Sequence, residues 1–124
     1  MKTYEAVADA LAQESEGLIF GLMSDANMAV WSALCSDPRV RMVWSRHENG
    51  AIAMADGYAQ ASGKLAFATV TCGPGLANAA NALLSASRAG SPMVVFTGEY
   101  IPDGGKRNLQ AFDQRLFART CEAA

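Results

Sequence analysis

Four short apolar runs alternate with longer stretches of helical periodicity, and this alternation limits the possible folds more than any other feature of the 124-residue chain. The runs scarcely alternate between apolar and polar residues, which is typical of strands buried on both faces of a parallel sheet. They cover residues 18–22, 39–44, 65–71 and 92–98. Strands that alternate with helices in this way predict an α/β fold, a parallel sheet with helices on both faces.

Apolar residues spaced three and four apart predict the helices that join these strands. Gly63 follows one of them as a C-terminal cap, and Asp37-Pro38 ends another. The predicted helices cover residues 3–16, 28–36, 47–61, 76–89 and 109–120. No repeat or linker interrupts the pattern, so residues 1–124 are predicted to form one domain. The sequence stops at Ala124 with no residue that ends a helix, and we expect the domain to be truncated at its C-terminal end.

The composition excludes several classes of protein. Hydrophobic residues make up 51% and charged residues 18% of the chain, which is the balance of a globular domain. The net charge is −2 and the basic residues are scattered, so no nucleic-acid partner is expected. No apolar stretch approaches the roughly 18 residues that span a bilayer, and early acidic residues leave no signal-peptide core. No contact with a membrane is therefore expected.

The cysteines indicate a reducing compartment. Cys35, Cys72 and Cys121 are odd in number, far apart in the sequence and free of any C-x-x-C spacing. With a single histidine in the chain, the usual zinc spacings cannot be assembled, and no metal ligand is predicted. Unpaired thiols persist where the surroundings are reducing, so we expect a cytoplasmic protein.

Three loops follow predicted strands directly, and these loops are the candidate ligand-binding segments. They read "GLMSDAN", "SRHEN" and "TCGPG". In parallel sheets, ligands bind at the carboxyl ends of the strands, in the loops that lead into helices. Asp25, Glu48 and the glycine turn are therefore expected at one edge of the sheet, and their coincidence is more informative than any one of them.

The turn Gly73-Pro74-Gly75 lies between a strand and a helix. Glycines there let the backbone approach a ligand closely. The dinucleotide fingerprint requires a third small residue where this chain has Asn78, and no Lys-Ser/Thr pair follows as in a P-loop. The turn alone leaves two alternatives open, a ligand-binding loop and a tight turn before a packed helix.

His47 and Glu48 stand where a strand meets a helix. In one interpretation, Glu48 interacts with the helix macrodipole and His47 is a surface or cap residue. In the other, the small residues Ala51, Ala55 and Ala59 bring Glu48 close to the buried layer. A carboxylate in that layer needs a partner or becomes protonated, which is how enzymes tune a catalytic acid.

Asp25 also has a structural and a functional interpretation. It follows the first predicted strand, where an aspartate can cap the next helix. It can equally be an acid of a site at this edge of the sheet. The residue alone does not decide between the two.

The sequence motifs together resemble a known family. "FGL…DxN", "RHExxAxxMADGYA", "ATVTCGPGLANAANALLSA" and "SPxVVxTGE" are similar to the N-terminal domain, often called the Pyr domain, of thiamine-diphosphate-dependent enzymes. The group includes acetolactate synthase, pyruvate oxidase and benzoylformate decarboxylase. The resemblance extends from about residue 3 to residue 119 and implies the thiamine-diphosphate-binding fold for nearly the whole chain.

The resemblance implies a catalytic role for Glu48. The matching glutamate of the family hydrogen-bonds the pyrimidine nitrogen that faces away from the thiazolium ring. Sharing a proton there favours the imino tautomer, whose nitrogen removes the proton of thiazolium C2. A water-poor site strengthens such a hydrogen bond.

The resemblance also implies roles for other residues. Gly73, Pro74, Gly75 and Asn78 match the stretch that lies against the cofactor ring. Asp25 falls where several decarboxylases have an active-site acid, although Met23-Ser24 replaces the usual Pro-Gly and alters that loop. Gln114 falls near an active-site glutamine of the synthases and oxidases, and His47 is expected to be structural.

The family segment G-D-G…N, which holds magnesium and the diphosphate, is absent from the chain. The resemblance therefore implies thiamine diphosphate with Mg²⁺ ligands on a missing domain or a partner chain, within a homo-oligomer or a mixed assembly. The expected activity is that of an acetolactate synthase-like decarboxylase or carboligase acting on a 2-oxo acid. The alternatives are a stand-alone nucleotide-binding or regulatory α/β module, and the Pyr subunit of a split decarboxylase.

Overall fold

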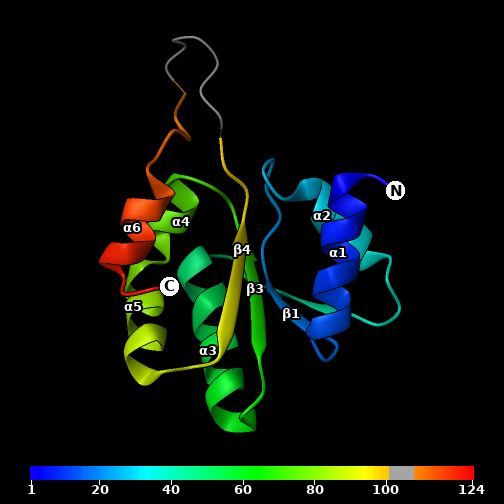
Figure 1. The fold of residues 1–124 in the computed structure, drawn as a ribbon, viewed down its shortest axis with the longest axis horizontal. Coiled ribbons are helices and arrows are strands. Elements are labelled where there is room, and N and C mark those ends of the chain that lie inside the picture. The colour runs from blue at the N-terminus through cyan, green and yellow to red at the C-terminus, as the bar shows by residue number, and fades with distance from the viewer. Residues whose placement is uncertain (101–107) are drawn as a thin grey trace.

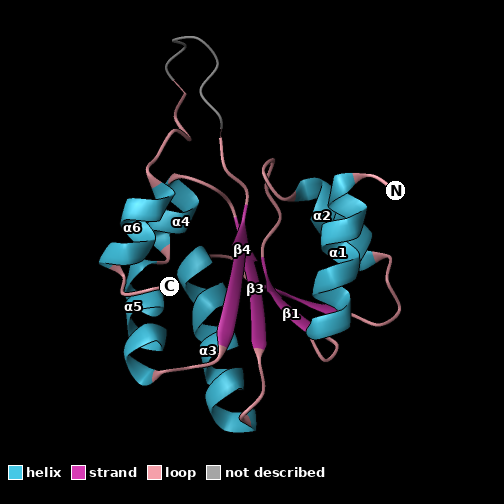
Figure 2. Ribbon diagram, in the orientation of Figure 1, coloured by secondary structure: helices cyan, strands magenta, loops and turns pink. Residues whose placement is uncertain are grey.

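A computed structural model describes residues 1–100 and 108–124. Four parallel strands form one sheet with the order β2-β1-β3-β4, and Figure 2 shows β1, β3 and β4 in this sheet. The strands are β1 (Leu18–Gly21), β2 (Arg41–Trp44), β3 (Ala66–Val70) and β4 (Met93–Thr97). Each of them lies within one predicted apolar run, so the predicted parallel sheet is confirmed.

Helices cover both faces of this sheet, as predicted. One face carries α1 (Thr3–Glu14) and α2 (Met28–Cys35), and Figure 1 shows the remaining helices on the opposite face. These are α3 (Glu48–Ser62), α4 (Pro74–Asn78), α5 (Ala80–Ala89) and α6 (Gln114–Thr120). No helix in the described part of the chain is long and apolar enough to cross a membrane.

The two inner strands supply the centre of the core. All five residues of β3 are buried, because alternate side chains of a strand point to opposite faces and both faces are covered. On one face Ile19 and Phe67 pack with Leu34, and on the other Phe20 packs with Ile52. The edge strands β2 and β4 are only partly buried, so burial on both faces is a property of β1 and β3.

Small residues let α3 lie close to the sheet. Ala51, Ala55 and Ala59 are at most 1% exposed, whereas Met54 and Gly57 on the outer side are exposed. The helix ends at Gly63, whose φ of 69° is the left-handed conformation that glycine adopts without strain. This confirms Gly63 as the predicted C-terminal cap.

The predicted helix over residues 76–89 is wrong in one respect, because the structure contains two helices there. Pro74 occupies the first turn of α4, where its fixed φ favours helix and its missing N–H is not needed. The chain then tightens at Ala79, whose N–H is directed to the carbonyl groups of Leu76 and Ala77, and α5 begins at the next residue.

The last predicted helix, over residues 109–120, is too long at its N-terminal end. Helix α6 begins at Gln114, because Asp113 acts as its N-cap and accepts a hydrogen bond from the backbone N–H of Leu116 at 2.9 Å. A capping aspartate of this kind satisfies an otherwise unpaired N–H of the first turn. Residues 109–113 therefore lie outside the helix.

The closeness of β1 and β3 gives a stability prediction. A Cβ atom at Gly21 would lie 2.2 Å from the carbonyl oxygen of Thr69, so Gly21→Ala must displace backbone in the centre of the sheet. We expect a loss of more than about 2 kcal/mol in the free energy of unfolding, measured by chemical denaturation. Gly57→Ala is the matched control, since no atom outside its own stretch of helix lies within 4 Å of its Cβ position. The control should gain about 0.5–1 kcal/mol from helix propensity. Equal effects of the two substitutions would contradict this account of the packing.

Candidate functional site

The predicted site residues lie around the carboxyl edge of the sheet, the upper edge in Figure 1. The loop with Asp25 follows β1, Glu48 begins α3 after β2, and the glycine turn follows β3. Parallel strands deliver all three segments to the same edge. A hydrogen bond links Glu48 to Asn78 directly, and another links the glycine turn to Gln114.

Glu48 is the first residue of α3 and is buried, with 9% of its surface exposed. The side-chain amide of Asn78 donates a hydrogen bond to its Oε2 atom at 3.2 Å. The Glu48 carboxylate therefore has a hydrogen-bond partner, as expected for an acid in the buried layer. His47 is the N-cap of α3, where its Nδ1 atom accepts from the backbone N–H of Asn49 at 3.2 Å. The structural role expected for His47 is confirmed.

The turn between β3 and α4 accommodates no side chain at either glycine. Gly73 has a φ of 62°, and a Cβ atom there would lie 2.4 Å from the carbonyl oxygen of Gln110. At Gly75, a Cβ atom would lie 1.9 Å from Cγ2 of Thr71 and 3.0 Å from Oε1 of Glu48. The bare backbone of α4 thus packs directly beside the Glu48 carboxyl group.

Gln114 connects this turn to the end of β4. Its Oε1 atom accepts a hydrogen bond from the backbone N–H of Gly73 at 3.0 Å, and its Nε2 atom donates to the carbonyl oxygen of Gly98 at 2.9 Å. The side chain is buried, with 9% exposure. Both polar ends of the amide are therefore engaged in holding the turn.

Asp25 is exposed and lies in the turn before α2. The N-cap of α2 is Asn27, so the alternative that Asp25 caps this helix does not hold. Asn27 is 1% exposed, and its amide nitrogen donates to Thr69 Oγ1 at 3.0 Å and to the carbonyl oxygen of Leu22 at 3.1 Å. Its Oδ1 atom accepts from the N–H of Ser24 at 2.8 Å. These bonds hold the loop that carries Asp25 against β3.

Sequence reasoning missed both Asn27 and Gln110 as residues that shape the site. Gln110 supplies the backbone against which Gly73 packs, and its Oε1 atom lies 3.7 Å from Sγ of Cys72. Asn27 could have been identified from the sequence, because it follows a predicted strand in a segment with two other turn-forming residues. No local pattern identifies Gln110, since its contact with Gly73 spans 37 positions of the sequence and depends on tertiary packing.

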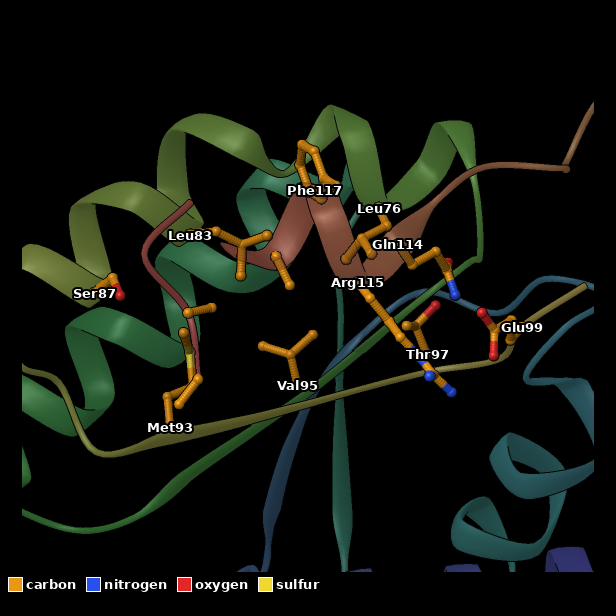
Figure 3. A pocket seen from close by; sticks show the side chains of 13 residues that line it. Leu76, Leu83, Ser87, Met93, Val95, Thr97, Glu99, Gln114, Arg115 and Phe117 are labelled. Atoms are coloured by element: carbon orange, nitrogen blue, oxygen red, sulfur yellow. The ribbon is translucent and has the colours of Figure 1, made fainter. Parts of the chain in front are cut away.

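A cavity of about 430 Å³ lies between β4, α5 and α6 (Figure 3). Met93, Val95 and Phe117 form part of its apolar lining, and Thr97 and Arg115 lie toward its polar end. Glu48 is not among its lining residues. The cavity is therefore separate from the Glu48 carboxyl group, although Gln114 borders it.

A buried acid beside a glycine turn, at the carboxyl edge of a parallel sheet, places the chain among α/β domains that bind a ligand at the strand ends. Residues 1–116 match the family described as "Thiamine pyrophosphate enzyme, N-terminal TPP binding domain". The chain belongs to this family, as its sequence motifs predicted.

A named relative agrees with this assignment. The mitochondrial catalytic subunit of acetolactate synthase from Saccharomyces cerevisiae is 37% identical over 113 residues, which cover 90% of this chain and 16% of the yeast protein. The chain is thus an acetolactate synthase-like N-terminal thiamine-pyrophosphate-binding domain. It spans less than a fifth of the length of this relative.

Solved structures have the same fold. A Mycobacterium smegmatis protein described as thiamin diphosphate-dependent aligns with a TM-score of 0.70 and 31% identity, over 80% of this chain and 19% of its own. The thiamine diphosphate-dependent 4-hydroxybenzoylformate decarboxylase of Rhodococcus jostii RHA1 aligns with a TM-score of 0.79 and 24% identity. That alignment covers 94% of this chain and 22% of the decarboxylase. The predicted fold is confirmed.

The two hydrogen bonds of Gln114 give a second stability prediction. Gln114→Leu leaves the buried N–H of Gly73 and the half-buried carbonyl group of Gly98 without their partner, and an unsatisfied buried group costs about 1–3 kcal/mol. We expect the free energy of unfolding to fall by about 1–3 kcal/mol in urea denaturation. Gln13→Leu, at an exposed position of α1, is the control and should change it by less than about 0.5 kcal/mol. A loss no larger than that of the control would show that Gln114 does not hold the turn.

Proposed function

We propose that Glu48 shares a proton with the aminopyrimidine ring of thiamine diphosphate, in an acetolactate synthase-like decarboxylase or carboligase that acts on a 2-oxo acid. The single observation that carries the proposal is the buried Glu48 carboxyl group, oriented by Asn78 at the carboxyl edge of the sheet. Membership of the thiamine pyrophosphate enzymes supports the cofactor, and the similarity to acetolactate synthase supports the substrate class.

The residues beside Glu48 fit the ring of this cofactor. One carboxyl oxygen, Oε2, accepts from Asn78, and neither oxygen forms an ion pair with a described residue. The group therefore keeps acceptor positions with which it can hold a proton against a ring nitrogen. Its burial removes competing water and strengthens such a hydrogen bond.

Thiamine diphosphate, when bound, supplies a thiazolium carbon that loses its proton, adds to a carbonyl group and stabilises the charge left by departing CO2. The task of Glu48 in this chemistry is proton transfer at the pyrimidine nitrogen. Gly73, Pro74 and Gly75 form the turn that would lie against the flat ring, with Gly75 packed beside Glu48, and Asn78 keeps the carboxylate oriented.

We assign supporting roles to Gln114 and Asp25. Gln114 holds the turn that faces the ring, which is a positioning role because both ends of its amide bind backbone. Asp25 is the exposed acid of the neighbouring loop, held against β3 through Asn27. Its exposure leaves it free to meet a substrate at the same edge of the sheet.

The diphosphate group and Mg²⁺ need ligands from elsewhere. No cluster of three or more His, Cys, Asp or Glu residues that could hold a metal ion occurs among the residues the structure describes. We propose that another domain or a partner chain holds Mg²⁺ and the diphosphate, within a homo-oligomer or mixed assembly. Cys35, Cys72 and Cys121 are free thiols, which supports a reducing compartment such as the cytoplasm.

Exchange of the C2 proton tests the role of Glu48. In the natural protein that carries these residues, Glu48→Gln should slow exchange of the cofactor's C2 proton by about 10²–10⁴-fold, because the amide cannot transfer a proton to the ring nitrogen. The measurement is hydrogen–deuterium exchange at C2, followed by NMR after acid quench. Glu14→Gln, an exposed substitution on α1, is the matched control and should leave the rate unchanged.

Exchange at nearly the wild-type rate in Glu48→Gln would refute the assignment. Separate titrations with thiamine diphosphate and NAD distinguish the alternative function. Binding of NAD alone would favour a nucleotide-binding or regulatory module.

A further inference from the structure

Helix α5 begins without a cap of its own. Its N-cap residue is Ala79, which has no side chain able to accept a hydrogen bond. The backbone N–H of Ala82, at the third position of α5, instead donates to Oδ1 of Asn49 at 2.9 Å. An N–H at this position normally bonds to the side chain of the helix's own N-cap. The cap of α5 is therefore supplied by a residue of α3.

The bond to Asn49 matters for stability because its donor residue, Ala82, is buried, with 5% of its surface exposed. Water has little access to its N–H, and a buried N–H without a partner is unfavourable. Asn49 is in turn fixed on its own helix, where its backbone N–H donates to Nδ1 of His47. Asn49 thus links the first turn of α3 to the first turn of α5.

Glu48 and Asn49 are neighbours in the sequence, and both bind the segment that contains α4 and α5. Glu48 accepts from the side chain of Asn78, and Asn49 accepts from the backbone of Ala82 four residues later. Asn78 is exposed at the end of the five-residue helix α4. Of the two contacts, the one made by Asn49 is with buried backbone and is the more firmly anchored.

The apolar contacts of α3 do not by themselves fix where the helix lies relative to α5. The inner side of the helix carries small residues such as Ala51 and Ala55 beside one large residue, Ile52, and apolar contact is non-directional. A hydrogen bond requires a defined distance and angle. The bond between Asn49 and Ala82 therefore fixes the first turn of α3 relative to α5. A second bond, donated by Ser91 Oγ to Asp56, holds the middle of the helix.

We propose that Asn49 is a positioning residue for Glu48, which acts by capping α5 from α3 and so fixes the carboxyl group against the glycine turn. The inference rests on the proton-transfer role proposed for Glu48. A carboxyl group that acts on a ring nitrogen must be held within a fraction of an ångström of its productive position, because a displacement of about 1 Å can cost about 10²-fold in rate.

Three substitutions in the natural protein separate this role from general stability. Asn49→Leu keeps the approximate volume and removes the acceptor, whereas Asn49→Asp keeps an acceptor oxygen on a side chain of the same length. Asn81→Leu makes the same chemical change at an exposed position of α5 and is the matched control. Asn49→Ala replaces Asn49→Leu if the latter does not fold.

The first measurement is amide hydrogen exchange in protein without cofactor. Asn49→Leu should lower the protection of the Ala82 amide by about tenfold or more, while Asn49→Asp and Asn81→Leu should preserve it.

The second measurement is C2-proton exchange of bound thiamine diphosphate. Asn49→Leu should slow it by about 10–10²-fold with cofactor affinity changed less than about threefold, and Asn49→Asp should stay within about threefold of wild type.

Wild-type C2 exchange in Asn49→Leu would overturn the positioning role, and so would slow exchange in Asn49→Asp with Ala82 still protected. Unchanged protection of Ala82 in Asn49→Leu would show that the bond is not what caps α5. Glu48→Gln, measured beside them, separates two failures. Wild-type exchange in Glu48→Gln refutes the proposed function itself, whereas slow exchange there with fast exchange in Asn49→Leu refutes only the role of Asn49.

Discussion

The alanine side of α3 is the constraint on which the site depends. Because Ala51, Ala55 and Ala59 project only a methyl group, the helix lies close to β1 and β3. This close packing places the first residue of the helix, Glu48, in a buried position at the carboxyl edge of the sheet. Larger residues on that side would move the helix outward and expose the carboxyl group. The close packing of α3 thus accounts both for this part of the fold and for the burial of Glu48.

The segment after β3 meets Glu48 from the other side. Two glycines remove the side chains that would collide with Gln110, Thr71 and the carboxyl group, and Gln114 holds the turn from α6. The break at Ala79 then separates α4 from α5. This break lets Asn78 reach Glu48 while the following helix packs along α3.

The sequence predicted the features that follow local rules. Short apolar runs located all four strands, and Gly63 marked the end of α3. The break at Ala79 was missed because alanine favours a continuous helix, so tertiary packing overrides propensity there. The late start of α6 was missed because Leu109 and Phe112 extend the apolar spacing beyond the cap at Asp113. The partners of Asn27, Asn49 and Gln114 are distant in the sequence and follow only from the folded arrangement.

A crystal structure of the natural protein with thiamine diphosphate bound tests the central claim most directly. The measured quantity is the distance between the carboxyl oxygens of Glu48 and the nearest nitrogen of the pyrimidine ring. The account predicts a hydrogen bond of about 2.6–3.0 Å to that nitrogen. A ring bound elsewhere on the domain, or one whose nitrogen lies more than about 4 Å from Glu48, would contradict it.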